Sequence, residues 1–435
     1  MTIFFFECKK FFKRKTVWIT VLLSIIALVS LYVFSHSKAE EVRERNIGFM
    51  KKNIEAQPER NAHANREIQK VENGPAIEKE AALNMKKIYE REHDIEHRWL
   101  KAYEEKDWGE LNHVEEENIS FWMEEYKGMA SFYYFIGEDS NMAWFTARAT
   151  LEELKRLEEH AIEPFVQPKP YTNSFPFLAT IYDDYKGRSL EEWEQLTKRY
   201  ATTGWSFMYQ LIQGMAIPVL ILIGCFIFGN NVSAEVGSKK RGLLFYYVLP
   251  VKRRNVFLAK YMSGLLMTLL FVVCMLLVPV MSGLFIGDIG SLKYPVLVYD
   301  GSIPSTVDPM FNSLKPMEDT FHFITLQEYI GKIGLLTLTV TIMMYSLYYV
   351  LSILVKVPPV TVLLTAIITF IGMKMPPLPY NPFSYIDMNK IVNREAATLA
   401  FNPAMEIQNG LFVVSVVACL FIALGYMLFK RIDLS

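Results

Sequence analysis

The chain has no surplus of charge, since 45 Lys plus Arg are balanced by 46 Asp plus Glu. A nucleic-acid-binding protein should carry a basic surplus, so that class of protein is excluded. Cysteine is scarce, and four residues in 435 do not make a disulfide scaffold. The P-loop motif G-x-x-x-x-G-K-[ST] is also missing, because Gly237-Ser-Lys-Lys lacks the earlier glycine and the Gly-Lys-Ser/Thr ending. A nucleotide site of that kind is therefore not expected on this chain.

The near-neutral total hides a strong segregation of charge along the chain. Residues 35–204 contain 24 basic and 34 acidic residues, whereas the remainder contains 21 basic and 12 acidic residues. Half of the whole chain, 51%, is hydrophobic, and the long apolar runs lie outside residues 35–204. This pattern is typical of a membrane protein with one large hydrophilic insert.

Six segments are apolar enough to predict transmembrane helices, which need about 20 residues. They are residues 17–34, 205–229, 261–286, 333–355, 360–375 and 411–429. The first follows a basic stretch like that of a signal peptide, but its 18 residues exceed the roughly 7–15 of a secretory h-region, so we interpret it as an uncleaved anchor. The fifth has only 14 apolar residues before Lys374. It either borrows residues beyond this lysine or ends in a re-entrant loop.

The distribution of Lys and Arg between the loops predicts the orientation of these spans. Fifteen basic residues lie on the side of the N-terminus, and six lie in the short segments on the opposite side, mainly 287–332 and 376–410. The N-terminus, the 230–260 loop and the 430–435 tail are therefore expected in the cytoplasm, with residues 35–204 outside. Because this insert has no cysteine, it suits the plasma membrane of a bacterium.

The hydrophilic insert is expected to be mostly helical. Residues 39–160 are rich in strong helix formers, and apolar residues three and four positions apart predict amphipathic helices there. Ser189-Leu-Glu-Glu-Trp has the pattern of a capping box that opens a last helix leading into the second span. The expected fold is thus an all-α polytopic membrane protein, with six transmembrane helices and a mostly helical extracytoplasmic domain between the first and second spans.

One motif in the insert has the pattern of a metallopeptidase. His93-Asp-Ile-Glu96-His97 places two imidazoles one helical turn apart with a carboxylate between them, as in the H-x-x-E-H motif of inverzincins. His113 is a further candidate metal contact. A solvated, charge-rich helical face explains the motif more simply, because the insert holds six of the seven histidines and no third ligand can be identified. We therefore predict no metal site, with His93 and His97 as weak candidates.

The most informative segment is the 230–260 loop between the second and third spans. Glu235 precedes Gly237 and a basic turn that ends at Arg241, and a following apolar run stops at Pro250. Anchoring at the lipid headgroups explains the basic residues nearest the third span, which are Lys252, Arg253, Arg254 and Lys260. It does not explain the acid, the glycine or the proline.

This loop resembles the one between the second and third spans of the permease subunits of type-2 ABC transporters, which carry an E-x-G…L-L…P-V-x-R…K pattern. The matching positions are Glu235, Gly237, Leu243, Leu244, Pro250, Val251, Arg253 and Lys260. The Phe-rich, basic segment 1–16 resembles the interfacial elbow helix of that family. Residues 376–410 resemble its external re-entrant segment, and a large insert follows the first span in its sodium-efflux and antibiotic-export branches. The resemblance covers the membrane part and not the insert.

The resemblance implies a division of labour between subunits. ATP and Mg²⁺ would bind a separate cytoplasmic P-loop ATPase, so this chain would hold no cofactor and no catalytic residue. The segment from Glu235 to Arg241 would be a coupling helix in a groove of that ATPase, with Gly237, Pro250 and Arg253 in the same coupling region. A second permease subunit, in a homodimer or a heterodimer, would complete the pathway among the membrane lipids. The implied function is export of an antimicrobial peptide, drug, lipid-like molecule or cation.

Polar groups inside the spans need an explanation, because burying them unpaired is costly. Gln210 and Gln213 in the second span and Tyr345 in the fourth are candidates for the translocation path. Interhelical hydrogen bonding is the simpler explanation for each. Two other functions stay open: a membrane-anchored extracytoplasmic metallopeptidase that uses the H-x-x-E-H motif, and a sensor or adaptor whose outer domain binds a ligand.

Overall fold

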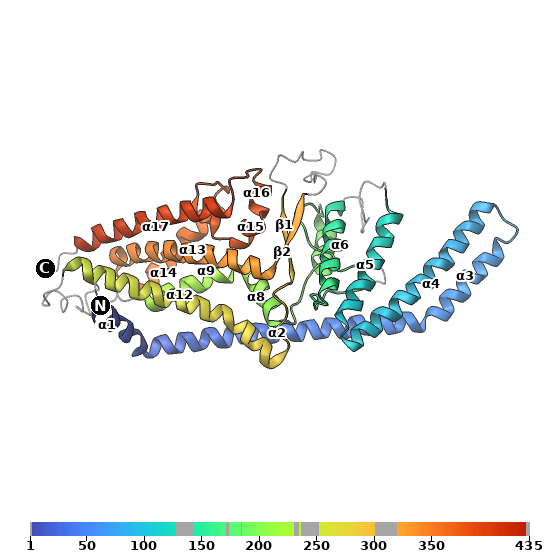
Figure 1. Ribbon diagram of the computed structural model, residues 1–435, viewed down its shortest axis with the longest axis horizontal. Coiled ribbons are helices and arrows are strands. Elements are labelled where there is room, and N and C mark those ends of the chain that lie inside the picture. The colour runs from blue at the N-terminus through green and yellow to red at the C-terminus, as the bar shows by residue number, and fades with distance from the viewer. Residues whose placement is uncertain are drawn as a thin grey trace.

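The computed structural model describes residues 2–127, 142–170, 174–183, 185–229, 235, 252–300 and 320–431. The molecule is elongated and almost entirely helical, and it has two parts (Figure 1). At one end, long apolar helices lie side by side, and both chain termini lie at the outer limit of this part. We call it the apolar bundle. The other part, which we call the polar module, comprises the described portions of 35–203 and of 287–325.

The apolar bundle is built from helices of very different length. They are α1 (Thr2–Phe12), the first half of α2 (Lys15–Glu55), α8 (Gly204–Gln213), α9 (Ala216–Phe228), α12 (Arg253–Ile286), α13 (Leu326–Val355), α14 (Pro358–Lys374) and α17 (Ile407–Lys430). Four of them, α2, α12, α13 and α17, are long and apolar enough to cross a membrane. The sequence predicted a span within each of these four, and the structure confirms a helix of sufficient length and apolar character at each place.

The central helix of the bundle is α13, and most of its apolar stretch is buried against neighbouring helices. Val340, Met343 and Tyr348 have no exposed surface at all. By contrast, α12 and α17 leave large apolar side chains on their outer faces, such as Leu270 and Leu420. A surface of this kind is stable in lipid and unfavourable in water.

The second predicted span is not one continuous helix. The chain bends by 81° between α8 and α9, at Met215, whose φ of 59° is left-handed. Pro218 follows within the first turn of α9, where the missing N–H costs nothing. The 13 residues of α9 measure only about 20 Å. The segment predicted as the second span is therefore a bent pair of helices.

The fifth predicted span corresponds to α14, which has 17 residues. This helix begins directly after the turn that ends α13. It is shorter than a typical membrane crossing, which needs about 20 residues. Beyond it lie three short helices, η1 (Pro382–Tyr385), α15 (Met388–Val392) and α16 (Glu395–Leu399), within the predicted re-entrant segment.

The polar module is organised on the second half of α2, which continues out of the bundle without a break (Figure 1). A hairpin of α3 (Gln57–Lys70) and α4 (Ala76–Glu105) projects beyond it, and α5 (Trp108–Glu125) and α6 (Trp144–Glu159) pack beside each other. The last helix, α7 (Gly187–Leu196), has Lys186 as its N-cap, so the predicted cap at Ser189 is wrong. Nor does α7 enter the second span, because an extended stretch with a bridge from Tyr200 to Val166 follows it.

A two-stranded antiparallel sheet completes the polar module, which the sequence predicted to be mostly helical. Strand β1 (Pro295–Tyr299) pairs with β2 (Phe321–Thr325), with Leu297 opposite Phe323. Both come from the segment 287–332, which the sequence suggested was only a connecting loop. Stacking between the rings of Phe145 on α6 and Tyr299 on β1, with centroids 5.8 Å apart, joins this sheet to the insert.

The start of α8 packs against the end of α12 through two glycines. A Cβ added to Gly283 would lie 2.9 Å from the Cα of Gly204 and 2.6 Å from the carbonyl oxygen of Asp288. Only residues without a side chain allow backbones to approach so closely. This contact holds the bent segment against the end of α12.

We predict that Gly283→Ala destabilises the protein by about 1–3 kcal/mol, because the backbones must separate. The measurement is the midpoint of thermal unfolding of the purified protein in detergent. Gly334→Ala in α13 is the matched control, because an added Cβ there meets nothing within 4 Å. That variant should be neutral or slightly stabilising, and equal loss of stability in both variants would contradict the close-packing argument.

Candidate functional site

Four charged side chains meet near the end of the apolar bundle that carries the chain termini. The Nζ atom of Lys260 lies 3.0 Å from Oε1 of Glu7 and 2.6 Å from Oε2 of Glu235. The Nζ atom of Lys10 lies 3.0 Å from Oε1 of Glu7 and 3.0 Å from Oε1 of Glu235. Carboxylates and ammonium groups therefore alternate around a closed ring, which we call the charge cluster.

The charge cluster is largely shielded from solvent. The side chains of Glu7 and Lys260 have 0% exposure, and that of Glu235 has 10%. Burying one unpaired charge costs several kcal/mol, so these groups are stable here only because their charges cancel and each has an opposite partner. The cluster joins three segments that are distant in the sequence: helix α1, the loop at residue 235, and helix α12.

Packing around the cluster explains why Lys260 points inward. Val256, Phe257 and Gly264 precede and follow it at helical spacing, and all are buried. Lys260 thus belongs to the inward face of α12, and its predicted role as a headgroup anchor is wrong. Sequence reasoning also missed Glu7 and Lys10. Their spacing of one helical turn in an otherwise Phe-rich segment was the available signal.

The structure places the predicted coupling residues unequally. Glu235 lies in the charge cluster, whereas Gly237, Arg241 and Pro250 lie outside the described residues. Arg253 is the first residue of α12, and its Nη1 donates a hydrogen bond to the carbonyl oxygen of Lys430 at 3.0 Å. Glu235 and Arg253, on either side of the undescribed stretch, are thus both bonded to the bundle.

The three candidates for a translocation path do not lie together. The side-chain amide of Gln210 donates a hydrogen bond to the backbone carbonyl of Arg199 at 2.6 Å. Gln213, one turn further along α8, is exposed. The module end of α13 reaches α8, since Tyr329 packs on Tyr209. Tyr345 lies 16 residues further along α13, about 24 Å away, and it is completely buried. Gln210 therefore anchors the chain that enters α8.

The His93–His97 pair is present, but its carboxylate has another partner. The two imidazole rings lie edge to face with centroids 4.4 Å apart. Burial, followed by the neighbouring His97, lowers the pKa of His93. Glu96 is fully buried and forms an ion pair with Nη2 of Arg60 at 3.0 Å. A peptidase would need that carboxylate as a base, and here the guanidinium occupies it.

The described residues contain no group of three or more His, Cys, Asp or Glu side chains that could hold a metal ion. The further candidate, His113, is bound elsewhere, with Nδ1 3.0 Å from Oε1 of Glu158.

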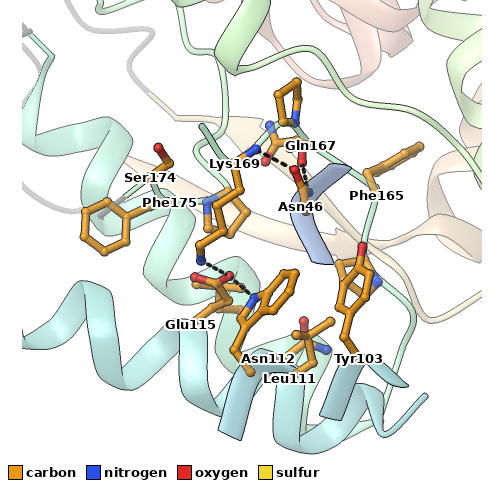
Figure 2. Close-up of a pocket in the computed structure, with 15 residues that line it drawn as sticks. Asn46, Tyr103, Leu111, Asn112, Glu115, Phe165, Gln167, Lys169, Ser174 and Phe175 are labelled. Carbon is orange, nitrogen blue, oxygen red and sulfur yellow. Dashed lines mark hydrogen bonds and ion pairs between the residues drawn. The ribbon is translucent and has the colours of Figure 1, made fainter. Parts of the chain in front are cut away.

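A small pocket of about 50 Å³ lies inside the polar module, between α2, α4, α5 and the segment 164–169 (Figure 2). Nζ of Lys169 lies 2.5 Å from Oε1 of Glu115, which also accepts a hydrogen bond from Nε1 of Trp99 at 2.7 Å. Asn46 on α2 accepts a hydrogen bond from the backbone N–H of Lys169 and donates one to the carbonyl of Gln167. Because the space suits only one or two water molecules, we assign these contacts the role of fastening the 167–169 segment to α2 and α5.

No protein-family model, curated protein or solved structure matches the chain. The fold therefore defines the class of protein only broadly, as a helical protein with several helices of membrane-crossing length. Any finer assignment has to come from the charge cluster and from the pattern of the loop that contributes Glu235 to it.

We predict that Lys260→Met destabilises the protein by about 3–5 kcal/mol, because it leaves two carboxylates with Lys10 as their only shared cation in a largely buried site. Thermal unfolding in detergent measures this. Lys252→Met, the same substitution at an exposed residue, should change the unfolding midpoint little. Adding Glu7→Gln to Lys260→Met should recover part of the loss, and strictly additive losses would show that the charge cluster does not act as a unit.

Proposed function

We propose that the chain is the transmembrane permease subunit of an ATP-binding-cassette exporter, which moves a substrate out of the cytoplasm by using ATP hydrolysis on a separate subunit. The charge cluster is the observation that carries this proposal. Glu235 and Lys260 are the first and last residues of the loop pattern, and they form a direct ion pair. A loop that only connected two helices would have no need of a buried ion pair.

The cluster suits the transmission of force from a partner. A cytoplasmic P-loop ATPase seated on the 230–260 loop would push on residue 235 when its nucleotide sites close. Because Glu235 is bonded to both Lys10 and Lys260, that displacement would act on α1 and α12 together. Movement of these helices against a second permease subunit would open the pathway, with ATP and Mg²⁺ bound only by the partner.

The position of the termini favours the proposed orientation. Both ends of the chain lie at the outer end of the apolar bundle, opposite the polar module (Figure 1). This arrangement requires an even number of crossings, and six result if the bent pair α8–α9 and the short α14 each count as one. The termini and the 230–260 loop would then be cytoplasmic, and the polar module would lie outside the plasma membrane of a bacterium.

Two other functions were open from the sequence. The ion pair between Arg60 and Glu96 argues against a metallopeptidase, because it holds the required base in a buried contact. A sensor or adaptor would share the fold, but it would not need an ATPase partner. Association with an ATPase therefore distinguishes a permease subunit from a sensor or adaptor.

The test is co-purification of the full-length protein with a cytoplasmic P-loop ATPase of the same cell, followed by measurement of ATP hydrolysis and transport. We expect Glu235→Gln to leave the ATPase bound but to lower transport per ATP by at least about fivefold, as for loss of a typical coupling energy. Glu72→Gln, at an exposed position in the polar module, is the matched control and should behave as the original protein.

Two results would count against the proposal. Failure of any ATPase to bind the full-length protein would refute the permease assignment. Full transport per ATP in Glu235→Gln would refute the role of the charge cluster in coupling, while leaving the assignment itself in place.

A further inference from the structure

A groove of about 730 Å³ opens where α2 leaves the apolar bundle and enters the polar module. Its walls come from α2, from the segment around Pro168 and Pro170, and from α7 with the extended chain that follows it. This volume is within the range of sites that take a small organic molecule. The groove is open to the surface, and we call it the boundary groove.

The boundary groove is basic, although the module around it is acidic. Its charged residues are Lys38, Glu41, Arg45, Arg188, Glu192 and Lys198. Four cations against two carboxylates leave an excess of positive charge, whereas residues 35–204 as a whole contain 34 acidic and 24 basic residues. A surface whose sign is opposite to that of its surroundings attracts an anion to that place in particular.

The carboxylates in the groove do not cancel its cations. Glu41 is shared between Lys38, at 2.6 Å, and Arg45, at 3.2 Å. Glu192 pairs with Arg188 at 3.0 Å. Nζ of Lys198 lies 5.6 Å from the centroid of the Tyr200 ring. Each cation keeps donors that can turn to a phosphate oxygen, because an ammonium has three N–H groups and a guanidinium five.

One face of α2 changes from apolar to charged at the groove. Leu23, Leu31 and Phe34 lie on this face at helical spacing, and each is at least half exposed. The same face continues with Lys38, Glu41 and Arg45, which lie four, seven and eleven residues after Phe34. Phe34 itself lines the groove. A ligand with an apolar tail and an anionic head would match this order along the helix.

We propose that the boundary groove binds an anionic phospholipid of the surrounding membrane, with its phosphate among Lys38, Arg45, Arg188 and Lys198 and its acyl chains along the apolar face of α2. The inference rests on the proposed function only in taking α2 as a membrane span. It adds a ligand to a part of the chain that the loop pattern does not cover. Bound lipid would fill the space between α2 and α7, and would hold the polar module at the membrane surface.

The test measures lipid binding by the full-length protein in detergent by native mass spectrometry, without any ATPase. Phosphatidylglycerol and phosphatidylcholine of equal chain length are the probes. The original protein should retain the anionic lipid in preference to the zwitterionic one. The double variant Lys38→Gln/Lys198→Gln should bind phosphatidylglycerol about tenfold more weakly, since each basic residue near a membrane surface contributes appreciably to the attraction. Its phosphatidylcholine binding should not change.

Lys79→Gln/Lys86→Gln on α4 is the control, with the same change of charge far from the groove. An equal loss in the control would overturn the proposal, because bulk charge would then explain the binding. Displacement of the lipid by soluble glycerol phosphate at the same concentration would also overturn it, because the apolar face would then contribute nothing. Because ATPase binding is measured separately, failure of this proposal and failure of the permease assignment are distinguishable.

Discussion

The architecture depends on one continuous helix that serves in two different environments. Because an α-helix satisfies its backbone hydrogen bonds internally, the 41 residues of α2 can run from the apolar bundle into the polar module without a break. Only the side chains change, from Leu and Ile to Lys, Glu and Arg. The elements of the polar module are then placed by this helix, either directly or through a neighbour. Arg43 pairs with Glu163, and Asn46 holds the segment at Lys169.

Ion pairs shielded from solvent occur in both parts of the molecule. In the polar module, Glu153 and Arg199 form a buried pair at 2.6 Å that also accepts the hydroxyl of Tyr294. This pair fastens the chain leaving the module to the segment 287–300. In the bundle, the charge cluster fastens a loop and an N-terminal helix to α12. Both sets of ion pairs thus join segments that are distant in the sequence.

Much of the bundle could be predicted from the sequence, because long apolar runs have few alternatives in an apolar environment. The helices around residues 17–34, 261–286, 333–355 and 411–429 follow from composition and length alone. The close contact of Gly204 with Gly283 could not be predicted, because the two residues lie 79 positions apart in the chain. The sheet of β1 and β2 was missed for a similar reason: its two strands come from separate segments, and its Tyr299 stacks on Phe145 in a third.

In the candidate site, too, some features could be predicted from the sequence and others depend on tertiary packing. Glu235 could be singled out because an acid within a basic loop is unexpected, and Lys260 could be singled out only as the last residue of the loop pattern. That the two are paired, and that Glu7 and Lys10 close the ring, depends on packing α1 against α12. Likewise, the change of α2 from apolar to charged residues is written in its sequence, whereas the groove beside it exists only because α7 and the chain after it pack there.

The sequence by itself determined which segments are apolar, which are charged, and where one kind gives way to the other. Those properties are local, since they follow from the side chains and from helical periodicity. Tertiary structure alone decided which charges meet, where a span bends and which surfaces form a groove. The physical reason is that a buried ion pair or a close glycine contact is stable only when residues distant in the chain are brought together, and no single segment contains that information.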